Sequence, residues 1–248
     1  SDLKEKSLLD KTKKSLFFSK DQLSIISQIN QVYAQESAIA QAFPTTGTRK
    51  LICLLIGYKD KPFVRTNADF DALFNTLGYT VDNATGSVKD FYAENSYNQL
   101  NLQTDVAGPF VASQNLAYYG TNDASGYDLY PRELVTEAIN LADPTVNFAN
   151  YDNDGDGWVD GVYVIYAGYG EEAGAPSNTI WAHAWSLASA VLKDGKYLQR
   201  YSCSSELRGT SGTSLCRIGV ICHEFGHVLG SPDFYDTNYS TNGQYEGT

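Results

Sequence analysis

The sequence contains no methionine, only three histidines and only four cysteines among its 248 residues. The cysteines form no CxxC pair, which disfavours a cysteine-rich metal site. No apolar run approaches the roughly 18 residues that a membrane helix needs, and the polar start at Ser1 is unlike a signal peptide. Basic residues are also scarce, because 18 Lys and Arg stand against 29 Asp and Glu, a net charge of −11. We therefore expect no membrane span and no binding to nucleic acid.

The composition is otherwise that of a globular protein, with 42% hydrophobic and 13% aromatic residues. In the first part of the chain, Ser19 and Gln22 form a capping box ahead of a helical apolar pattern. This pattern predicts an amphipathic helix that ends near Phe43. We therefore divide the chain into an N-terminal helical segment, residues 1–42, and a larger domain, residues 43–248.

The larger domain alternates between strand and helix patterns. Residues 50–57 form a continuous apolar run, which is typical of a strand buried on both faces. Further strands are predicted at 100–106, 159–167 and 196–202, and helices at 67–77, 87–98 and 131–142. This alternation predicts an α+β domain, close to the α/β class, with a mixed twisted sheet.

One motif carries the chemistry. Residues 223–227 read His-Glu-x-x-His. On a helix, positions i and i+4 share a face, so His223 and His227 can bind one ion while Glu224 lies beside them. Two of the three histidines of the chain fall at this spacing, which disfavours an ordinary solvated helix.

A catalytic zinc ion needs a third protein ligand and one position open to water. Gly230 can end the helix in the left-handed conformation and Pro232 prevents its resumption, so the chain can fold back and offer Asp233. Glu246 is a rival third ligand, but the turn-forming residues before it provide no helix to hold it. Asp236 is a weaker competitor. The preferred site is therefore His223, His227 and Asp233.

The chemistry of such a site is peptide hydrolysis. Zinc polarises a carbonyl group and activates a bound water, and Glu224 takes the proton of that water and passes it to the leaving amine. The expected enzyme is a zinc metalloendopeptidase acting on a protein or peptide substrate.

At these residues the sequence closely resembles the immune inhibitor A-type family of secreted bacterial zinc metallopeptidases. The motif reads His-Glu-x-x-His-x-x-Gly-x-x-Asp, a metzincin-like pattern with Asp in place of a third His. Further family-like blocks occur at 43–47, 86–97, 154–160, 167–172, 180–183 and 230–236.

The resemblance has several implications. It implies a zincin-like or metzincin-like catalytic domain with an active-site helix, secretion or display at the cell surface of a bacterium, structural calcium, and an intramolecular propeptide that residues 1–42 would represent. It also implies a Trp-Asp-x-Met turn beneath the zinc soon after Thr248. Since the printed sequence does not contain that turn, we expect the domain to continue beyond residue 248.

A second cation site is predicted in an acidic loop. Carboxylates occupy positions 1, 3, 5 and 9 of a loop with glycine at position 6, as in the opening of a calcium loop, namely Asp152, Asp154, Asp156 and Asp160. Tyr163 stands at position 12, where an EF-hand has Glu, so this is not an EF-hand. The alternatives are a calcium loop of another kind and a plain Asp/Gly turn before a strand.

Three smaller expectations remain open. A Cys203–Cys222 disulfide would brace the metal helix, and two free buried thiols are the alternative. His183 lies between two tryptophans and could either line the substrate cleft or pack in the core. Glu171 or Glu172 could form the rim of the cleft or add calcium ligands.

One function from another class competes with the peptidase. A calcium-stabilised secreted binding or adhesion module could retain the metal helix as a non-catalytic metal site. An open coordination position at the metal would favour the enzyme, and a fourth protein ligand would favour the binding module.

Overall fold

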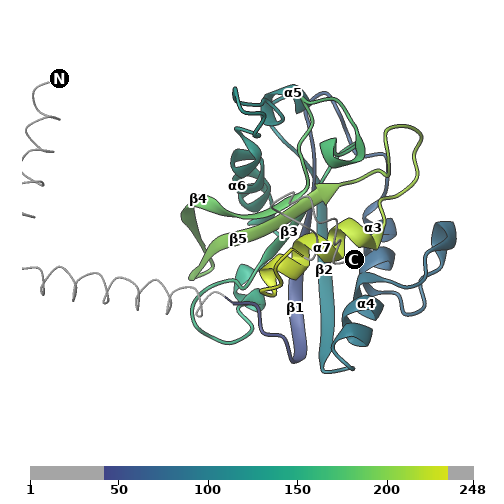
Figure 1. Cartoon of the computed structure of the whole chain (residues 1–248). Helices are drawn as coiled ribbons and strands as arrows, with labels where there is room; N and C mark the ends of the chain where they lie inside the picture. The colour runs from purple at the N-terminus through teal and green to yellow at the C-terminus, as the bar shows by residue number, and fades with distance from the viewer. Residues whose placement is uncertain (1–41, 234–248) are drawn as a thin grey trace, which may run out of the picture. The chain divides into compact units, whose positions relative to one another are not determined.

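The computed structural model describes residues 42–233 (Figure 1). The chain divides into two units, Ser1–Gln41 and Ala42–Thr248. The first unit lies outside the described residues, and so do the helix predicted before Phe43 and the rival ligands Asp236 and Glu246. The division of the chain into an N-terminal segment and a catalytic domain therefore stays a prediction.

The described unit is built on one mixed sheet of five strands in the order β2-β1-β3-β5-β4 (Figure 1). The first four strands in this order run parallel, and β4 pairs antiparallel with β5 at one edge. The strands are β1 (Gly47–Gly57), β2 (Leu100–Val111), β3 (Val162–Tyr166), β4 (His183–Lys193) and β5 (Lys196–Ser205). This arrangement confirms the predicted α+β class with a mixed sheet.

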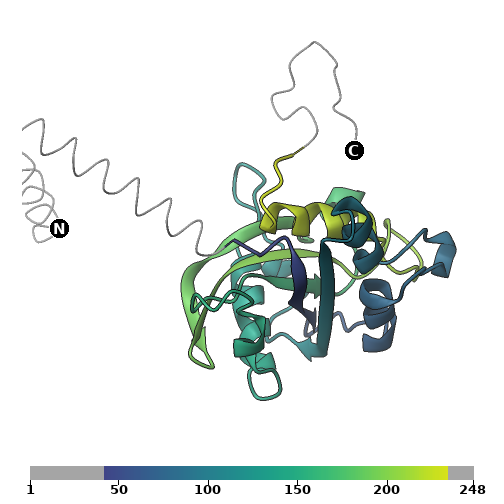
Figure 2. The ribbon, with the colours of Figure 1, turned by 90° about the horizontal axis from the view of Figure 1, so that it is seen from below.

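Helices cover both faces of the sheet. The α-helices are α3 (Asn67–Asn75), α4 (Val88–Asn95), α5 (Leu116–Tyr119), α6 (Pro131–Ala142) and α7 (Ile218–Val228). Short 3-10 helices lie at η1 (Val81–Asn83), η2 (Phe148–Tyr151) and η3 (Glu171–Ala173). In Figure 2, the yellow helix α7 lies on one side of the sheet and the teal helix α6 on the other, with their apolar residues in separate clusters.

The central strand β1 explains the two clusters. Its alternate residues Ile52 and Leu54 pack with α6, whereas Leu51 and Cys53 pack with α3, α4 and α7. Each of these side chains is at most 1% exposed. Burying an aliphatic side chain of this kind contributes about 1.5–3 kcal/mol, so the continuous apolar run is the reason β1 lies in the middle of the sheet.

Helix starts follow their capping residues. Thr66 with Asp69 and Ser87 with Asp90 form reciprocal capping boxes at α3 and α4. Pro131 stands in the first turn of α6, where its missing N–H costs nothing. These starts confirm the helices predicted at 67–77, 87–98 and 131–142, although the first two end two or three residues earlier.

The sequence reasoning overlooked strand β4. Its burial pattern is that of an edge strand, largely exposed and without a clean alternation. The signal that was available is the Asp194–Gly195 pair, whose φ values of 50° and 75° form the two-residue turn to β5. An Asp-Gly pair between two strands is a strong hairpin signal.

The prediction of a Cys203–Cys222 disulfide is wrong. All four cysteines are free and buried. Cys203 belongs to the cluster on the α6 face of the sheet, whereas Cys222 belongs to the cluster on the α7 face. Since the sheet separates the two sulfur atoms, the alternative of free buried thiols is the one observed.

Among residues 42–233, no helix combines the length and the apolar character required to cross a membrane.

Candidate metal centre

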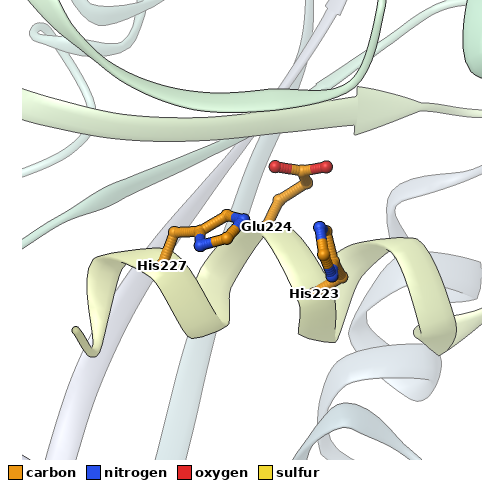
Figure 3. Close-up of side chains that lie close together, drawn as sticks. All are labelled: His223, Glu224 and His227. Carbon is orange, nitrogen blue, oxygen red and sulfur yellow. The ribbon is translucent and has the colours of Figure 1, made fainter. Parts of the chain in front are cut away.

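Helix α7 presents the His-Glu-x-x-His motif. Residues Ile221, Phe225 and Val228 recur at helical spacing and are at most 2% exposed, so they fix the face that packs against the sheet. His223 and His227 lie one turn apart on an adjoining face and are partly exposed. The ligand atoms of His223, Glu224 and His227 lie within 4.8 Å of one another, and Figure 3 shows the three side chains converging on one side of the helix.

The structure brings Asp233 to the two histidines. Its Oδ1 atom lies 3.4 Å from Nε2 of His223 and 3.2 Å from Nε2 of His227. Two ligands of a tetrahedral zinc ion, each about 2.0–2.1 Å from the metal, lie about 3.3 Å apart. The spacing of these three atoms therefore fits one small divalent cation between them.

The hydrogen bonding of Asp233 points the same way. Its Oδ1 atom is buried and has no hydrogen-bond donor within the described part of the chain. A buried carboxylate oxygen without a donor is costly, and a bound cation would offset that cost. The donor set of two imidazoles and one carboxylate is also one that zinc prefers.

A tight turn returns the chain to the helix. Gly230 adopts a φ of +95°, the left-handed region that glycine enters at little cost. The N–H groups of Gly230 and Ser231 donate to the carbonyl oxygens of His227 and Gly226 at 3.1 and 2.9 Å. This closes the end of α7 and brings Asp233 to the two imidazoles.

The same turn orients one imidazole. Nδ1 of His227 lies 2.9 Å from the carbonyl oxygen of Ser231. Because a carbonyl only accepts hydrogen bonds, Nδ1 carries the proton and donates it. Nε2 then keeps its lone pair toward Asp233, which is the arrangement that metal-binding histidines usually have.

Glu224 lies beside the histidines in a buried position. The residue is 7% exposed. Burial raises the pKa of Glu224 to about 7, and the carboxylates of Glu172 and Asp233 add to this. A carboxyl group with a pKa near neutrality can both accept and release a proton, as a general base and acid must.

The surroundings of His223 favour its neutral form. Burial and the neighbouring imidazole of His227 lower the pKa of His223, against the opposing effect of Asp233. Neutral imidazole is the form that binds metal ions.

Sequence reasoning did not assign a role to Tyr92. From α4, its buried hydroxyl donates a 2.7 Å hydrogen bond to the carbonyl oxygen of Cys222, the residue before His223. Its ring also packs edge-on against Phe225, with the ring centroids 5.4 Å apart. Tyr92 therefore braces the metal helix, and its place in a family-like block, residues 86–97, was the available signal.

A large cavity opens beside the motif. It has a volume of about 900 Å³ and lies against His223 and Glu224. Its other walls come from α4, from the turn after α7, and from the segment between β3 and β4, which contributes Glu172 and Trp181. The cavity gives a polypeptide substrate room to approach the candidate metal centre.

The acidic loop is held by internal bonds. The carboxylates of Asp152, Asp154 and Asp156 lie within 4.8 Å of one another. Asp152 accepts hydrogen bonds from the N–H groups of Gly155 and Gly157, and Lys196 Nζ lies 2.6 Å from its Oδ2 atom. An ammonium group thus neutralises one of the predicted calcium ligands.

The fourth predicted calcium ligand lies deeper in the fold. Asp160 is fully buried, and its Oδ2 atom accepts hydrogen bonds from the backbone and side chain of Asn153 at 2.7 and 2.8 Å. Asn153 in turn bonds to both backbone groups of Lys50 in β1. Burial raises the pKa of Asp160 to about 6, and its Oδ1 atom has no partner among the described residues.

Both ring nitrogens of His183 contact polar groups of the fold. Its Nδ1 atom lies 2.7 Å from the carbonyl oxygen of Trp181, and its Nε2 atom lies 2.8 Å from the hydroxyl of Tyr201. Both ring nitrogens are thus engaged within the fold, which favours the packing alternative over a role in the cleft.

Comparison with known proteins decides the family. Residues 46–247 match the model of the immune inhibitor A peptidase M6 catalytic domain. The chain belongs to the M6 peptidase family. This confirms the resemblance seen in the sequence and favours a metallopeptidase over the binding module.

Two curated relatives illustrate the relationship. The chain is 30% identical over 245 residues to the pre-pro-metalloprotease PrtV of Vibrio cholerae serotype O1, a match that covers 79% of this chain and 26% of the relative. It is 28% identical over 187 residues to immune inhibitor A of Bacillus thuringiensis subsp. alesti, covering 63% of this chain and 26% of the relative. This M6 peptidase chain therefore spans about a quarter of the length of the curated relatives that it matches.

Proposed function

We propose that this chain is the catalytic domain of a secreted bacterial zinc endopeptidase, with His223, His227 and Asp233 as zinc ligands. The observation that carries the proposal is the Oδ1 atom of Asp233, which lies at ligand spacing from both imidazoles and has no other partner among the described residues. Membership in the M6 family and the names of its bacterial relatives support the rest.

Each residue then has a defined task. When bound, zinc would supply a Lewis acid that polarises the scissile carbonyl group and lowers the pKa of a water molecule to about 7. Glu224 takes a proton from that water and later donates it to the nitrogen of the leaving amine. The Ser231 carbonyl holds the His227 ring in position, and the cavity beside α7 gives the substrate room next to Glu224.

The test is Glu224→Gln in the full chain. The variant should keep one zinc ion, because the ligands remain, yet lose about 10²–10⁴-fold in cleavage of a casein-type substrate. Glu133→Gln makes the same chemical change on α6, across the sheet, and should cleave normally. Undiminished cleavage by Glu224→Gln would refute its role as general base.

Residues 1–42 are proposed to form the propeptide of this peptidase. The relative from Vibrio cholerae is named a pre-pro-metalloprotease, which supports such a segment. Phe43 is 2% exposed and packs edge-on against Phe225 of the metal helix, so it belongs to the core of the domain. Activating cleavage should therefore fall before Phe43. N-terminal sequencing of the activated protein tests this, and a mature form that begins after Phe43 would contradict it.

Calcium in the acidic loop is a further proposal. The close carboxylates of Asp152, Asp154 and Asp156 and the unpartnered oxygen of Asp160 support it, whereas the Lys196 ammonium opposes it. Calcium that binds only the folded state would raise the melting temperature. A rise in the wild type that disappears in Asp154→Asn would support the site. An unchanged melting temperature would contradict a calcium site and would indicate that the Lys196 ammonium alone neutralises the acidic loop.

A further inference from the structure

The cavity beside α7 contains a second carboxylate, to which the proposed reaction assigns no direct step. Glu172, from η3, lines this cavity together with His223 and Glu224. Within residues 42–233, no Lys or Arg lines the cavity and none pairs with Glu172. The carboxylate therefore borders the substrate space, and no cation of the described residues neutralises it.

The local chain holds this carboxylate in place. The carboxylate of Glu172 packs against Gly170, and a side chain at position 170 would push it aside. The N–H of Ala182 donates a 3.1 Å hydrogen bond to Oε2. The N–H of Glu172 itself donates a second hydrogen bond. An ionised carboxylate can accept about four hydrogen bonds, so part of its accepting capacity remains. Two backbone N–H groups therefore orient the Glu172 carboxylate.

The rest of the cavity is suited to an aliphatic stem. Phe91, Trp181 and Val220 line it and expose 38%, 54% and 38% of their surfaces. Long basic side chains bury their methylene groups along such apolar walls while the charged end reaches a polar partner. The aromatic faces of Phe91 and Trp181 would also attract a cation.

The negative charges around the cavity also favour a basic side chain of the substrate. Burial raises the pKa of Glu172, and Glu171 adds to this, so a cation in the cavity would relieve an electrostatic cost. An acidic substrate side chain would instead meet Glu172 as well as Glu224. A carboxylate in the wall of a largely apolar cavity thus attracts a basic group and repels an acidic one.

We propose that Glu172 is a specificity-determining residue that selects substrates with a lysine or arginine side chain in the cavity beside α7. The proposal rests on the proposed peptidase function, because it assigns the substrate class of that same site. The N–H of Ala182 acts by positioning the Glu172 carboxylate.

Matched peptides test the proposal. Two peptides that differ only by Lys or norleucine, placed in turn at each of the four positions around the cleaved bond, should show a preference for Lys at one position. The ratio of kcat/KM for Lys over norleucine should fall roughly 10- to 100-fold in Glu172→Gln, which loses a charge-assisted hydrogen bond. Glu172→Lys should shift the preference toward Glu at that position. The neighbouring control Glu171→Gln should keep the wild-type ratio.

A binding measurement separates this proposal from the proposed function. Calorimetry with the zinc-loaded Glu224→Gln variant measures the affinities of the same peptides without cleavage. Tighter binding of Lys than of norleucine peptides, abolished by adding Glu172→Gln, supports the specificity role even if the wild type cleaves nothing. Equal affinities for the two peptides would overturn it. It would also be overturned if Glu172→Gln shifted only the pH profile of kcat/KM and left the Lys preference intact, because Glu172 would then act through Glu224.

Discussion

At the scale of single residues, the donors and acceptors around the histidines decide which atoms can meet a metal ion. The Nδ1–H group of His227 donates a hydrogen bond to the Ser231 carbonyl oxygen. Its Nε2 atom is therefore free to face Asp233. Helical periodicity in the sequence predicts that His223 and His227 share a face. It does not predict the Ser231 carbonyl, because a backbone group after the helix is placed by the φ of Gly230 and not by a side-chain pattern.

The ion pair of Lys196 and Asp152 is another residue-scale feature. The Asp152 side chain is 1% exposed, and its Oδ2 atom lies 2.6 Å from Nζ of Lys196. Burial alone would raise the pKa of Asp152, but the ammonium of Lys196 and the N–H groups of Gly157 and Gly155 outweigh it and lower the pKa below its ordinary 3.8. Sequence spacing placed the acids of this loop together but could not show that a lysine 44 positions later would reach them.

Lys196→Met should therefore destabilise the domain in a pH-dependent way. At pH 7 we expect the free energy of unfolding to fall by about 1–3 kcal/mol, less than for a fully buried pair because Lys196 is partly exposed. A lowered folded-state pKa gives stability that is present above pH 3.8 and is lost as the pH falls through the folded-state pKa. The difference between wild type and variant should accordingly shrink in acid.

Urea unfolding at pH 7 and in acid measures this difference. Lys193→Met, in the same hairpin, removes the 2.8 Å pair with the more exposed Asp143 and should cost less than about 1 kcal/mol. A Lys196→Met variant as stable as the wild type at pH 7 would show that the loop does not depend on this ammonium.

At the scale of secondary-structure elements, the turn after α7 matters as much as the helix itself. The sequence predicted the helix, its end at Gly230 and the return of Asp233, because glycine and proline leave few alternatives at a helix end. The edge strand β4 was overlooked for the opposite reason, since half-exposed edge strands lack a clean alternation. The brace from Tyr92 to Cys222 joins elements 130 residues apart and leaves no local pattern.

Gly230→Ala should weaken zinc binding through this turn. An alanine at a φ of +95° is strained, so we expect a loss of about 1 kcal/mol of stability and a displaced Asp233. Zinc affinity, measured by competition with a chelator, should fall at least about 10-fold. Gly126→Ala introduces the same residue at a φ of +86° in a distant open loop. This control should lose similar stability and keep its zinc affinity, and equal zinc affinity in both variants would contradict the role of the Gly230 turn.

At the scale of the whole molecule, the mixed sheet separates two apolar clusters and carries the metal helix on one face. Alternating strand and helix patterns predicted this class of fold. The strand order could not be predicted, because it depends on which strands meet across long connections and not on the residues within each strand. The same separation rules out the Cys203–Cys222 disulfide, which only the placement of the cysteines on opposite faces could reveal.

The most direct test of the central claim is anomalous X-ray diffraction at the zinc edge from crystals of the full chain grown with zinc. The account predicts one anomalous peak per chain, about 2 Å from Nε2 of His223, Nε2 of His227 and Oδ1 of Asp233, with one coordination position open to water. Asp233→Asn should weaken or abolish the peak. A peak elsewhere, or a zinc ion bound by the histidines with Asp233 turned away, would contradict it.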